Sequence, residues 1–373
     1  MKVAIIHYWL LQMRGGEKVL ENICELFPNA TIYTHVLDKT KLSPFLQHMD
    51  IRTTFIHKLP FSKRLYKFYL PLMPFALEAL DLSEYDLIIS SESGPAKGIV
   101  PGDNSLHICY CHTPMRYLWG GYSSYFESSN FVQKFFMIFF FPFLRGWDVL
   151  TSKRVDFFLA NSSCVSSRIK KRYGRESTII FPPVDSAKIN NLQKKEQSQL
   201  ISFKAKSYYI CLGALVPYKR VDLAVKACCE SGRRLLIIGR GPELDKLKHM
   251  SGQNIQFIEE ADDQLAISAL ANAKALIFPG VEDFGIVPLE AQACYVPVIA
   301  FRSGGVLDTV TSNTGVFFEE QTVDSLIAAL NYFESNPHKF EDKNNFESNL
   351  SRFTRDNFKY TLTSFIKEKL HTN

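Results

Sequence analysis

Short runs of apolar, β-branched residues recur along the chain, and each is followed by a segment with helical or turn character. The runs lie at residues 2–8, 86–91, 106–112, 156–162 and 177–183 in the first half, and at 208–213, 234–239, 254–258, 275–280 and 296–301 in the second. Strands that are apolar on both faces and alternate with helices are typical of parallel sheets covered by helices on each side. Because the pattern occurs twice, the sequence predicts two doubly wound α/β domains.

A polar, charged segment separates the two sets of runs. Residues 186–207 show little apolar periodicity, and they follow Pro182 and Pro183, which end the preceding strand. The expected division is 1–188 for the first domain, 189–206 for a linker, 207–352 for the second domain and 353–373 for a C-terminal helix. Apolar residues recur at helical spacing in that last segment, so we expect the helix to pack on another part of the protein, with the first domain as a candidate.

Composition narrows the class of protein. A length of 373 residues suits two domains, and a net charge of +5 is too small to indicate nucleic-acid binding. The first residues lack a signal-peptide cleavage site, and no run of about 18 apolar residues indicates a spanning helix. The eight cysteines form no Cys-x-x-Cys pair and lie mostly in apolar runs, so we expect reduced, buried thiols in a cytoplasmic protein.

The segment GVEDFGIVPLEAQA, residues 280–293, has the composition of a strand-to-helix loop that can bind a ligand. Pro288 suits the first turn of a helix, and Gly285 lets the backbone approach a ligand closely. Unpaired N–H groups at a helix N-terminus favour a phosphate. Glu282 and Glu290 can accept hydrogen bonds from sugar or ribose hydroxyls. An ordinary loop with two solvated glutamates is the alternative.

Two further segments place cations or glycines where a diphosphate could bind. Lys219 and Arg220 follow the strand at 208–213, and the carboxyl edge of a parallel sheet is where such ligands lie. A solvated basic pair is the alternative. Gly15 and Gly16 precede a helix after the first strand, which permits close backbone approach, although the spacing matches neither a dinucleotide fingerprint nor a P-loop.

His112 and the absence of one motif complete the candidate chemistry. His112 follows a strand, so it can face a ligand at the sheet edge, although a structural histidine is the alternative. The chain contains no Asp-x-Asp motif, so a divalent metal that bridges a diphosphate has no obvious ligand set. We therefore expect no metal and no other cofactor.

Two aromatic and basic stretches, Phe55–Phe75 and Phe131–Trp147, allow two interpretations. Phenylalanine and leucine flanked by lysine and arginine fit a surface that touches anionic lipid. The alternative, which we prefer for most of these residues, is that the aromatic side chains fill the core of the first domain.

Together these segments resemble retaining glycosyltransferases of glycosyltransferase family 4, over essentially the whole chain. The most specific marker is the Glu-x7-Glu motif from Glu282 to Glu290, supported by GALVPYKRVDLAV, GRGPEL and the glycine pair. CHTPMRYLW and LVPYKRVDLA look like bacterial mannosyltransferases that use GDP-mannose to build O-antigen, capsule or exopolysaccharide. The resemblance implies a GT-B fold, in which two Rossmann-like domains face each other across a cleft.

The resemblance also implies partners and a location. It suggests a nucleotide-sugar donor, a lipid-linked glycan acceptor and a cytoplasmic enzyme at the inner face of the membrane. A UDP-sugar donor and a GT-B sugar-nucleotide epimerase remain alternatives.

Carried over residue by residue, the resemblance assigns roles to the candidate residues. Glu282 would hold hydroxyls of the transferred sugar, and Glu290 would bind the ribose. Backbone contacts to sugar and phosphate would come from Phe284, Gly285, Ile286 and Val287. The diphosphate would lie against Lys219 and Arg220, while Gly15, Gly16 and His112 would approach the donor from the first domain. Two positions depart from the family pattern: Ala214 replaces a common arginine, and Glu259 replaces a common glycine, which leaves guanine or uracil open.

Overall fold

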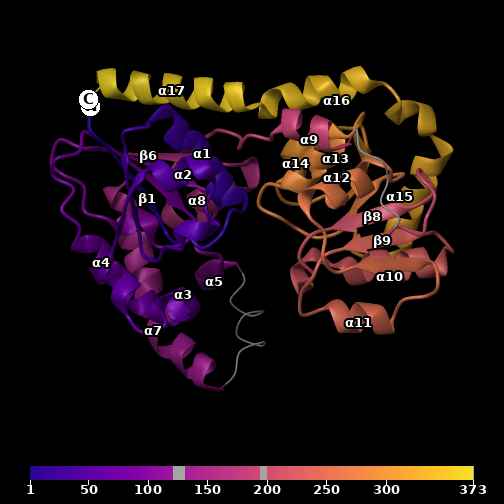
Figure 1. Ribbon diagram of the computed structural model, residues 1–373, viewed down its shortest axis with the longest axis horizontal. Helices are drawn as coiled ribbons and strands as arrows, with labels where there is room; N and C mark the ends of the chain where they lie inside the picture. Colours follow the sequence, from indigo (N-terminus) through magenta and orange to yellow (C-terminus); the bar gives the residue numbers. More distant parts are fainter. Residues whose placement is uncertain (121–130, 194–199, 373) are drawn as a thin grey trace. The chain divides into compact units, whose positions relative to one another are not determined.

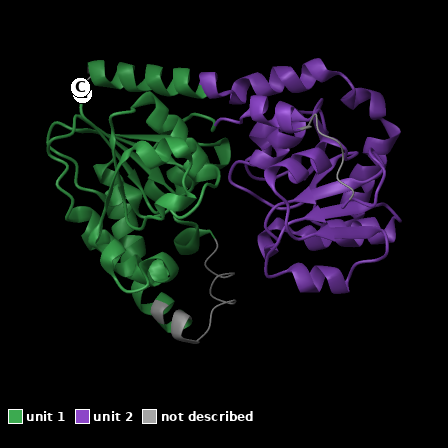
Figure 2. Ribbon diagram, in the orientation of Figure 1, with its two compact units in different colours: residues 1–182, 358–373 green, residues 183–357 purple. Residues whose placement is uncertain are grey.

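The computed structural model describes residues 1–120, 131–193 and 200–372, and it divides into two compact units (Figures 1 and 2). Unit 1 comprises residues 1–182 and 358–373, and unit 2 comprises residues 183–357. Each unit contains one parallel sheet with helices packed on its faces. The predicted pair of doubly wound α/β domains is therefore confirmed.

The sheet of unit 1 has seven parallel strands in the order β3-β2-β1-β4-β5-β6-β7. The strands are β1 (Val3–His7), β2 (Thr31–Thr34), β3 (Asp50–Thr53), β4 (Leu87–Glu92), β5 (Leu106–Cys111), β6 (Phe157–Ala160) and β7 (Ser177–Ile179). Every residue of β1, β4 and β5 is buried, which explains their continuous apolar sequences. The strands β2 and β3 were not predicted, because their sequences TIYT and DIRT are short and polar.

Helices cover both faces of this sheet. They are α1 (Gly15–Leu26), α2 (Pro44–His48), α3 (Ser62–Leu65), α4 (Met73–Glu78), α5 (Arg116–Trp119), α7 (Phe131–Thr151), α8 (Ser163–Tyr173) and most of α17 (Arg355–Thr372). One face packs against α1 and α17, where Phe358, Leu362 and Ile366 are buried in the same cluster as Ile5 and Ile89. The other face packs against α4 and α7.

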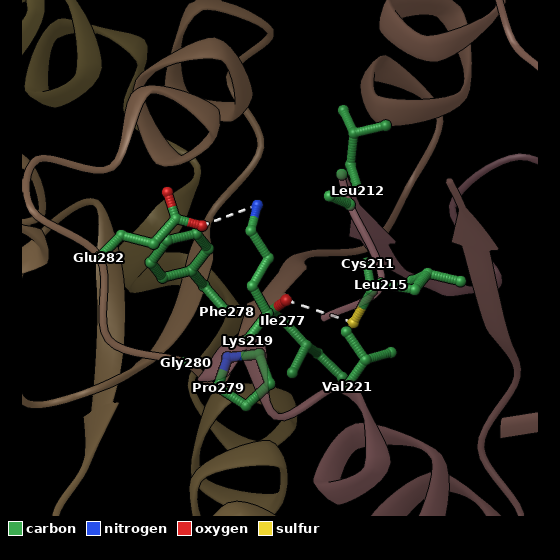
Figure 3. A pocket seen from close by; sticks show the side chains of 12 residues that line it. Cys211, Leu212, Leu215, Lys219, Val221, Ile277, Phe278, Pro279, Gly280 and Glu282 are labelled. Carbon is green, nitrogen blue, oxygen red and sulfur yellow. Dashed lines mark hydrogen bonds and ion pairs between the residues drawn. The ribbon is translucent and has the colours of Figure 1, made fainter. Parts of the chain in front are cut away.

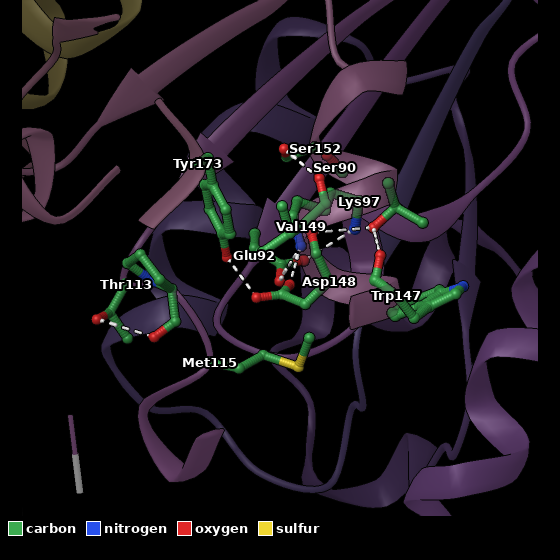
Figure 4. Close-up of polar contacts among 12 residues, drawn as sticks. Ser90, Glu92, Lys97, Thr113, Met115, Trp147, Asp148, Val149, Ser152 and Tyr173 are labelled. Carbon is green, nitrogen blue, oxygen red and sulfur yellow. Dashed lines mark hydrogen bonds and ion pairs between the residues drawn. The ribbon is translucent and has the colours of Figure 1, made fainter. Parts of the chain in front are cut away.

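A buried group of charges ties α7 to this sheet (Figure 4). The Lys97 side chain is fully buried and forms an ion pair with Asp148 of α7. The backbone N–H of Lys97 donates to Glu92 Oε2 at 2.8 Å. Asp148 Oδ2 also accepts from Trp119 Nε1 at 2.7 Å and from the Tyr173 hydroxyl at 2.9 Å.

Burial and neighbouring charge perturb two titrations in this cluster. Burial raises the pKa of the Glu92 carboxyl to about 8. Burial acts to lower the pKa of the Lys97 ammonium, but the Asp148 and Glu92 carboxyl groups outweigh it and raise that pKa. The Lys97 ammonium therefore stays charged near neutral pH, and Asp148 is the nearer of its two carboxyl partners.

The sheet of unit 2 has six parallel strands in the order β10-β9-β8-β11-β12-β13. The strands are β8 (Tyr209–Leu212), β9 (Leu235–Ile238), β10 (Ile255–Ile258), β11 (Leu276–Phe278), β12 (Val298–Phe301) and β13 (Gly315–Phe318). Strands β8 to β10 extend the sheet to one side, and β11 to β13 extend it to the other. The switch lies between the parallel neighbours β8 and β11, which pair through Ile210 and Leu276. In open α/β sheets, the carboxyl end of such a switch point is where ligands bind.

Helices cover both faces of this second sheet. They are α9 (Ser186–Gln193), α10 (Val221–Glu230), α11 (Leu244–His249), α12 (Asp263–Ala271), α13 (Ile286–Ala293), α14 (Val306–Thr309), α15 (Val323–Ser335) and α16 (Lys343–Leu350). The main apolar cluster lies between the sheet and the helices α10 and α15. At its edge, Glu334 accepts from Lys274, Tyr209 and Arg233 at 2.6–2.7 Å.

The division into units differs from the expected domain boundaries. The first unit ends at Pro182, and the residues expected to form a linker belong to unit 2 where the structure describes them. The helix α9 packs against α12 and α13, with Ile189 buried, and Ile201 is buried as well. Two isolated apolar residues anchor this polar segment without producing a periodic pattern, so the sequence resembled a linker.

All eight cysteines are free thiols. Six are buried, and burial raises the pKa of Cys211, for example, well above its usual value. Cys164 in unit 1 and Cys229 in unit 2 are partly exposed. The expected burial therefore holds for most of the thiols.

The aromatic stretches divide between core and surface. Met137, Phe141 and Leu144 of α7 are buried against the sheet, whereas Phe139 and Phe143 are 61% and 50% exposed. None of the helices in the described ranges is long and apolar enough to cross a membrane. The core interpretation is therefore confirmed for the buried residues, whereas contact with lipid stays a prediction for the exposed ones.

Candidate functional site

Lys219 occupies a position between the ends of two neighbouring strands of unit 2. It lies in the 3₁₀ turn η6 (Pro217–Lys219), directly before α10. A Cβ atom at Gly213, which follows β8, would lie 2.9 Å from Lys219 Nζ, and a Cβ at Gly280, after β11, would lie 2.5 Å from Lys219 Cα. Gly213 also has a φ of +128°, which disfavours any side chain. Gly280 is therefore needed for the close approach of the Lys219 backbone, and Gly213 for its own backbone conformation.

The lysine is paired with the first glutamate of the Glu-x7-Glu motif (Figure 3). Lys219 Nζ lies 2.8 Å from Glu282 Oε1, and the two side chains are 18% and 20% exposed. Both line a small cavity of about 20 Å³, together with Ala214 and residues at the ends of β8 and β11. A partly buried cation at this edge can stabilise a developing negative charge more strongly than a solvated one.

Further close contacts between backbones join the loops at this edge. A Cβ at Gly239 would lie 1.9 Å from Gly213 O, and one at Gly304 would lie 2.5 Å from Glu282 O. The Gly305 N–H donates to this backbone carbonyl oxygen of Glu282 at 2.8 Å. These contacts hold the loops after β8, β9, β11 and β12 together around the ion pair.

The remaining residues of the motif lie in the turn into α13. Phe284 is buried and its ring packs against Phe353, so this residue offers only its backbone to a ligand. Gly285 has a φ of +90° and precedes the first helical residue, Ile286, which is partly exposed like Val287. Glu290, on the second turn of α13, is also partly exposed.

Arg220 adopts a different orientation from its neighbour. Its backbone is left-handed, with φ of +50°, and its guanidinium lies 3.1 Å from Asp222 Oδ1. It does not line the cavity that holds Lys219 and Glu282. Since Ala214 lines that cavity in place of an arginine, the structure supplies Lys219 as its cation.

A second group of predicted residues lies at the carboxyl edge of the unit 1 sheet. A Cβ at Gly16, on the first turn of α1, would lie 2.8 Å from the Tyr8 hydroxyl and 3.8 Å from His112 Nε2. His112 Nε2 lies 3.0 Å from Ser91 Oγ, which in turn lies 3.1 Å from His7 Nδ1. The two glycines thus form the first turn of the helix rather than a loop before it, and the structure brings Gly16 and His112 together.

His7 and Ser91 were not predicted from the sequence. Each lies at or near the carboxyl end of a buried strand, β1 for His7 and β4 for Ser91. A polar side chain at the end of an apolar run is the sequence signal that could have identified them.

Unit 2 also carries an acidic groove beyond β10. Its volume is about 860 Å³, and it is lined by Leu200, Arg240, Glu259, Glu260, Ala261, Asp262, Gln264, Leu265 and Ser268. Arg240 forms ion pairs with Glu260 at 2.6 Å and with Glu259 at 3.8 Å. The unusual Glu259 thus belongs to a charged network rather than standing alone.

Comparison with known proteins agrees with this arrangement. Residues 193–352 match the family described as "Glycosyl transferases group 1". The second unit carries a glycosyltransferase group 1 domain. The match covers the cavity, both glutamates of the motif and the acidic groove.

Named relatives of the chain include bacterial mannosyltransferases. The chain is 32% identical over 212 residues to a GDP-mannose-dependent monoacylated alpha-(1-6)-phosphatidylinositol monomannoside mannosyltransferase from Corynebacterium glutamicum, an alignment that covers 48% of this chain and 56% of that protein. It is 25% identical over 256 residues to the O-antigen chain mannosyltransferase RfbU from Salmonella typhimurium, covering 65% and 67%. The chain thus spans about half the length of the first of these relatives.

Solved structures support the fold of the whole chain. HepE from Anabaena, in a crystal structure with UDP, superposes with a TM-score of 0.71 at 15% identity, covering 99% of this chain and 100% of that chain. At this identity the likeness shows the fold, which is the GT-B fold of two Rossmann-like domains.

Proposed function

We propose that this protein is a retaining glycosyltransferase that transfers mannose from GDP-mannose to a lipid-linked glycan at the cytoplasmic face of a membrane. The observation that carries the proposal is the Lys219–Glu282 ion pair at the carboxyl edge of the group 1 domain. One partner can neutralise a leaving diphosphate, and the other can accept hydrogen bonds from sugar hydroxyls. The names of the relatives support mannose as the sugar.

The proposed mechanism uses no side chain as a nucleophile. The bond between sugar and phosphate loosens while the acceptor hydroxyl attacks the same face of the sugar, and the departing phosphate oxygen takes the proton of that hydroxyl. Lys219 stabilises the charge that develops on the diphosphate, and Glu282 orients the sugar. Because Glu282 already holds the ammonium at 2.8 Å, the cation is in place before the reaction begins, which reduces the reorganisation required.

The acidic groove supports guanine over uracil as the base. Glu259, Glu260 and Asp262 line it, and a carboxylate has room for about four hydrogen bonds, so each can accept from a base in addition to its present partner. Guanine presents adjacent N–H donors, whereas uracil presents a single N–H. We therefore expect GDP to raise the melting temperature of the protein more than UDP does, because the nucleotide that binds the folded protein more tightly stabilises it more.

A transfer assay tests the function. The protein is incubated with labelled GDP-mannose, or with a panel of labelled UDP-sugars, and with a membrane lipid extract. Lipid-soluble label from GDP-mannose, in α-linkage by NMR of the released glycan, supports the proposal. Label from a UDP-sugar alone would overturn the donor, an altered free nucleotide sugar would indicate an epimerase, and no change with any donor would overturn catalysis.

The surface of unit 1 supports a lipid-borne acceptor. Aromatic side chains of α7 and of the segment that contains α3 and α4 are exposed, with Phe61 at 77%, Phe75 at 60% and Phe139 at 61%. Both α4 and α7 pack on the turn η4 (Ala96–Gly98), so these faces belong to one region of the unit. Exposed cations lie beside them at Lys58, Lys63, Arg64 and Lys67. Apolar rings flanked by cations fit an anionic membrane surface.

Vesicle binding tests this surface. We expect the protein to sediment with vesicles that contain about one-third phosphatidylglycerol, and less with pure phosphatidylcholine, because the cations favour anionic lipid by about 1 kcal/mol each. The double variant F61S/F139S should lose most of this binding. Leu307→Ser, which removes a 49% exposed apolar residue from unit 2, is the matched control. Equal sedimentation of the wild type and F61S/F139S would contradict the assignment.

A further inference from the structure

A line of polar side chains runs from His112 into the interior of unit 1. His7 Nδ1 lies 3.1 Å from Ser91 Oγ, and the same oxygen lies 3.0 Å from His112 Nε2. His7 and Ser91 are neighbours in register on β1 and β4, and their exposures are 1% and 0%. A single hydroxyl thus links a buried imidazole to a partly exposed one.

The line ends at a carboxylate on α1. Glu17 Oε1 lies 4.0 Å from His7 Nε2, with the two side chains 3% and 0% exposed. That His7 nitrogen is buried and has no hydrogen-bond partner within the described residues. Glu17 Oε2 accepts a hydrogen bond from the backbone N–H of Arg14 at 3.0 Å, which forms part of the cap of α1. Burial acts to raise the pKa of the Glu17 carboxyl, but His7 and the backbone N–H groups outweigh it, so this pKa lies below its usual value.

The charge of Glu17 sets the direction of the hydrogen bonds. An anionic carboxylate favours an N–H, rather than a lone pair, on the His7 nitrogen that faces it. In a neutral His7 ring, Nδ1 is then an acceptor, so Ser91 must donate its proton to it. The Ser91 oxygen is left to accept from His112, whose proton therefore resides on Nε2.

We propose that Glu17, His7 and Ser91 form a relay that holds His112 in the Nε2–H tautomer and so makes its Nδ1 an acceptor. The catalytic consequence rests on the function proposed above. An acceptor nitrogen suits a hydroxyl of the donor sugar, which can donate a proton, and disfavours a phosphate oxygen, which cannot. The three residues are positioning residues, because they act through His112.

The relay also explains how α1 is coupled to the site. Glu17 belongs to the first turn of α1, in the same cap that places Gly15 and Gly16. A Cβ at Gly16 would lie 3.8 Å from His112 Nε2, so the helix start and the imidazole are in direct proximity. One carboxylate thereby contributes both to the cap of the helix turn that holds the two glycines and to the tautomer of the histidine beside it.

Nuclear magnetic resonance of protein labelled with ¹⁵N-histidine tests the relay without an activity assay. The signals of His7 and His112 are identified by their loss in H7N and H112Q. We expect the proton on Nε2 of both rings. In E17Q the amide can still accept the Arg14 N–H but presents N–H donors to His7 Nε2, so both protons should move to Nδ1. A wild-type His112 with its proton on Nδ1, or tautomers unchanged in E17Q, would overturn the proposal.

Kinetics of the proposed transfer test the consequence. We expect E17Q and S91A to lower kcat about 10-fold or more, on the scale of the 10- to 100-fold losses known for partners that orient metal-bound histidines, with a smaller change in donor KM. Ser90→Ala is the matched control, because Ser90 Oγ lies 2.9 Å from His107 Nε2 in a pair that is equally buried but on the opposite face of β4. Its kcat should stay within about twofold, by comparison with that range.

The two proposals can fail separately. The expected tautomers without transfer from any sugar nucleotide would leave the relay standing and overturn the function. Transfer that is unaffected by E17Q and S91A would leave the function standing and remove the relay from it.

Discussion

Replacing Lys219 with alanine is expected to lower kcat for sugar transfer by about two to three orders of magnitude, the loss typical of one preorganised group that stabilises a transition-state charge. Lys219 is the cation that lines the cavity of unit 2, and no arginine stands at Ala214 to replace it. Removal of the ammonium also leaves Glu282 as an uncompensated carboxylate at the same place. Initial rates with saturating donor and acceptor measure the effect.

Two further variants show whether the loss is specific to Lys219. Lys226→Ala removes an exposed cation from the same segment and should leave kcat unchanged. Arg220→Ala should have a smaller effect than Lys219→Ala, because the Arg220 guanidinium lies against Asp222 and outside the cavity. Near-normal transfer by Lys219→Ala would mean that the leaving group is stabilised elsewhere.

Replacing Lys97 with methionine is expected to destabilise unit 1 by about 3–5 kcal/mol, the cost of leaving a buried charge without its partner. Methionine fills a similar volume, but it leaves Asp148 buried without its cation. Glu92 adds little charge, because burial raises the pKa of its carboxyl to about 8 and it is mostly protonated at neutral pH. The lost stability is therefore mainly that of one ion pair.

Tryptophan fluorescence during urea unfolding measures this effect in unit 1 alone. All three tryptophans of the chain, Trp9, Trp119 and Trp147, lie in that unit. The double variant K97M/D148N should recover a large part of the stability, because asparagine carries no charge and its amide oxygen can still accept from Trp119 and Tyr173. Lys171→Met, at an exposed position of the same unit, is the control. An unchanged urea midpoint in Lys97→Met would show that the pair is energetically neutral.

The fold was predictable where burial leaves a mark on the sequence. The strands β1, β4 and β5 are buried throughout, so their apolar residues are continuous and period and length identify them. The strand β2 is buried too, but two of its four residues are threonines, and β3 at the edge of the sheet is partly exposed and polar, so both resemble loop sequences. The polar segment that holds α9 was misassigned for the same reason.

The candidate site was predictable in its parts but not in its pairing. Lys219 and Glu282 both follow strands, so each could be assigned to a carboxyl edge. Their contact depends on β8 and β11 being neighbours in the sheet, which the 62 residues between Lys219 and Glu282 conceal. The sequence also treats Lys219 and Arg220 as equivalent, whereas a left-handed backbone at Arg220 directs the two side chains to different partners.

Because only two thiols are partly exposed, the distance between two nitroxide labels can be measured in this protein without introducing new cysteines. Six cysteines are buried, and the two partly exposed ones, Cys164 and Cys229, lie one in each unit. Brief treatment with a thiol-specific nitroxide should therefore place one spin label on each unit of the natural chain. The distribution of distances between the two labels, recorded with and without a nucleoside diphosphate, would report directly on how ligand binding changes the separation of the units.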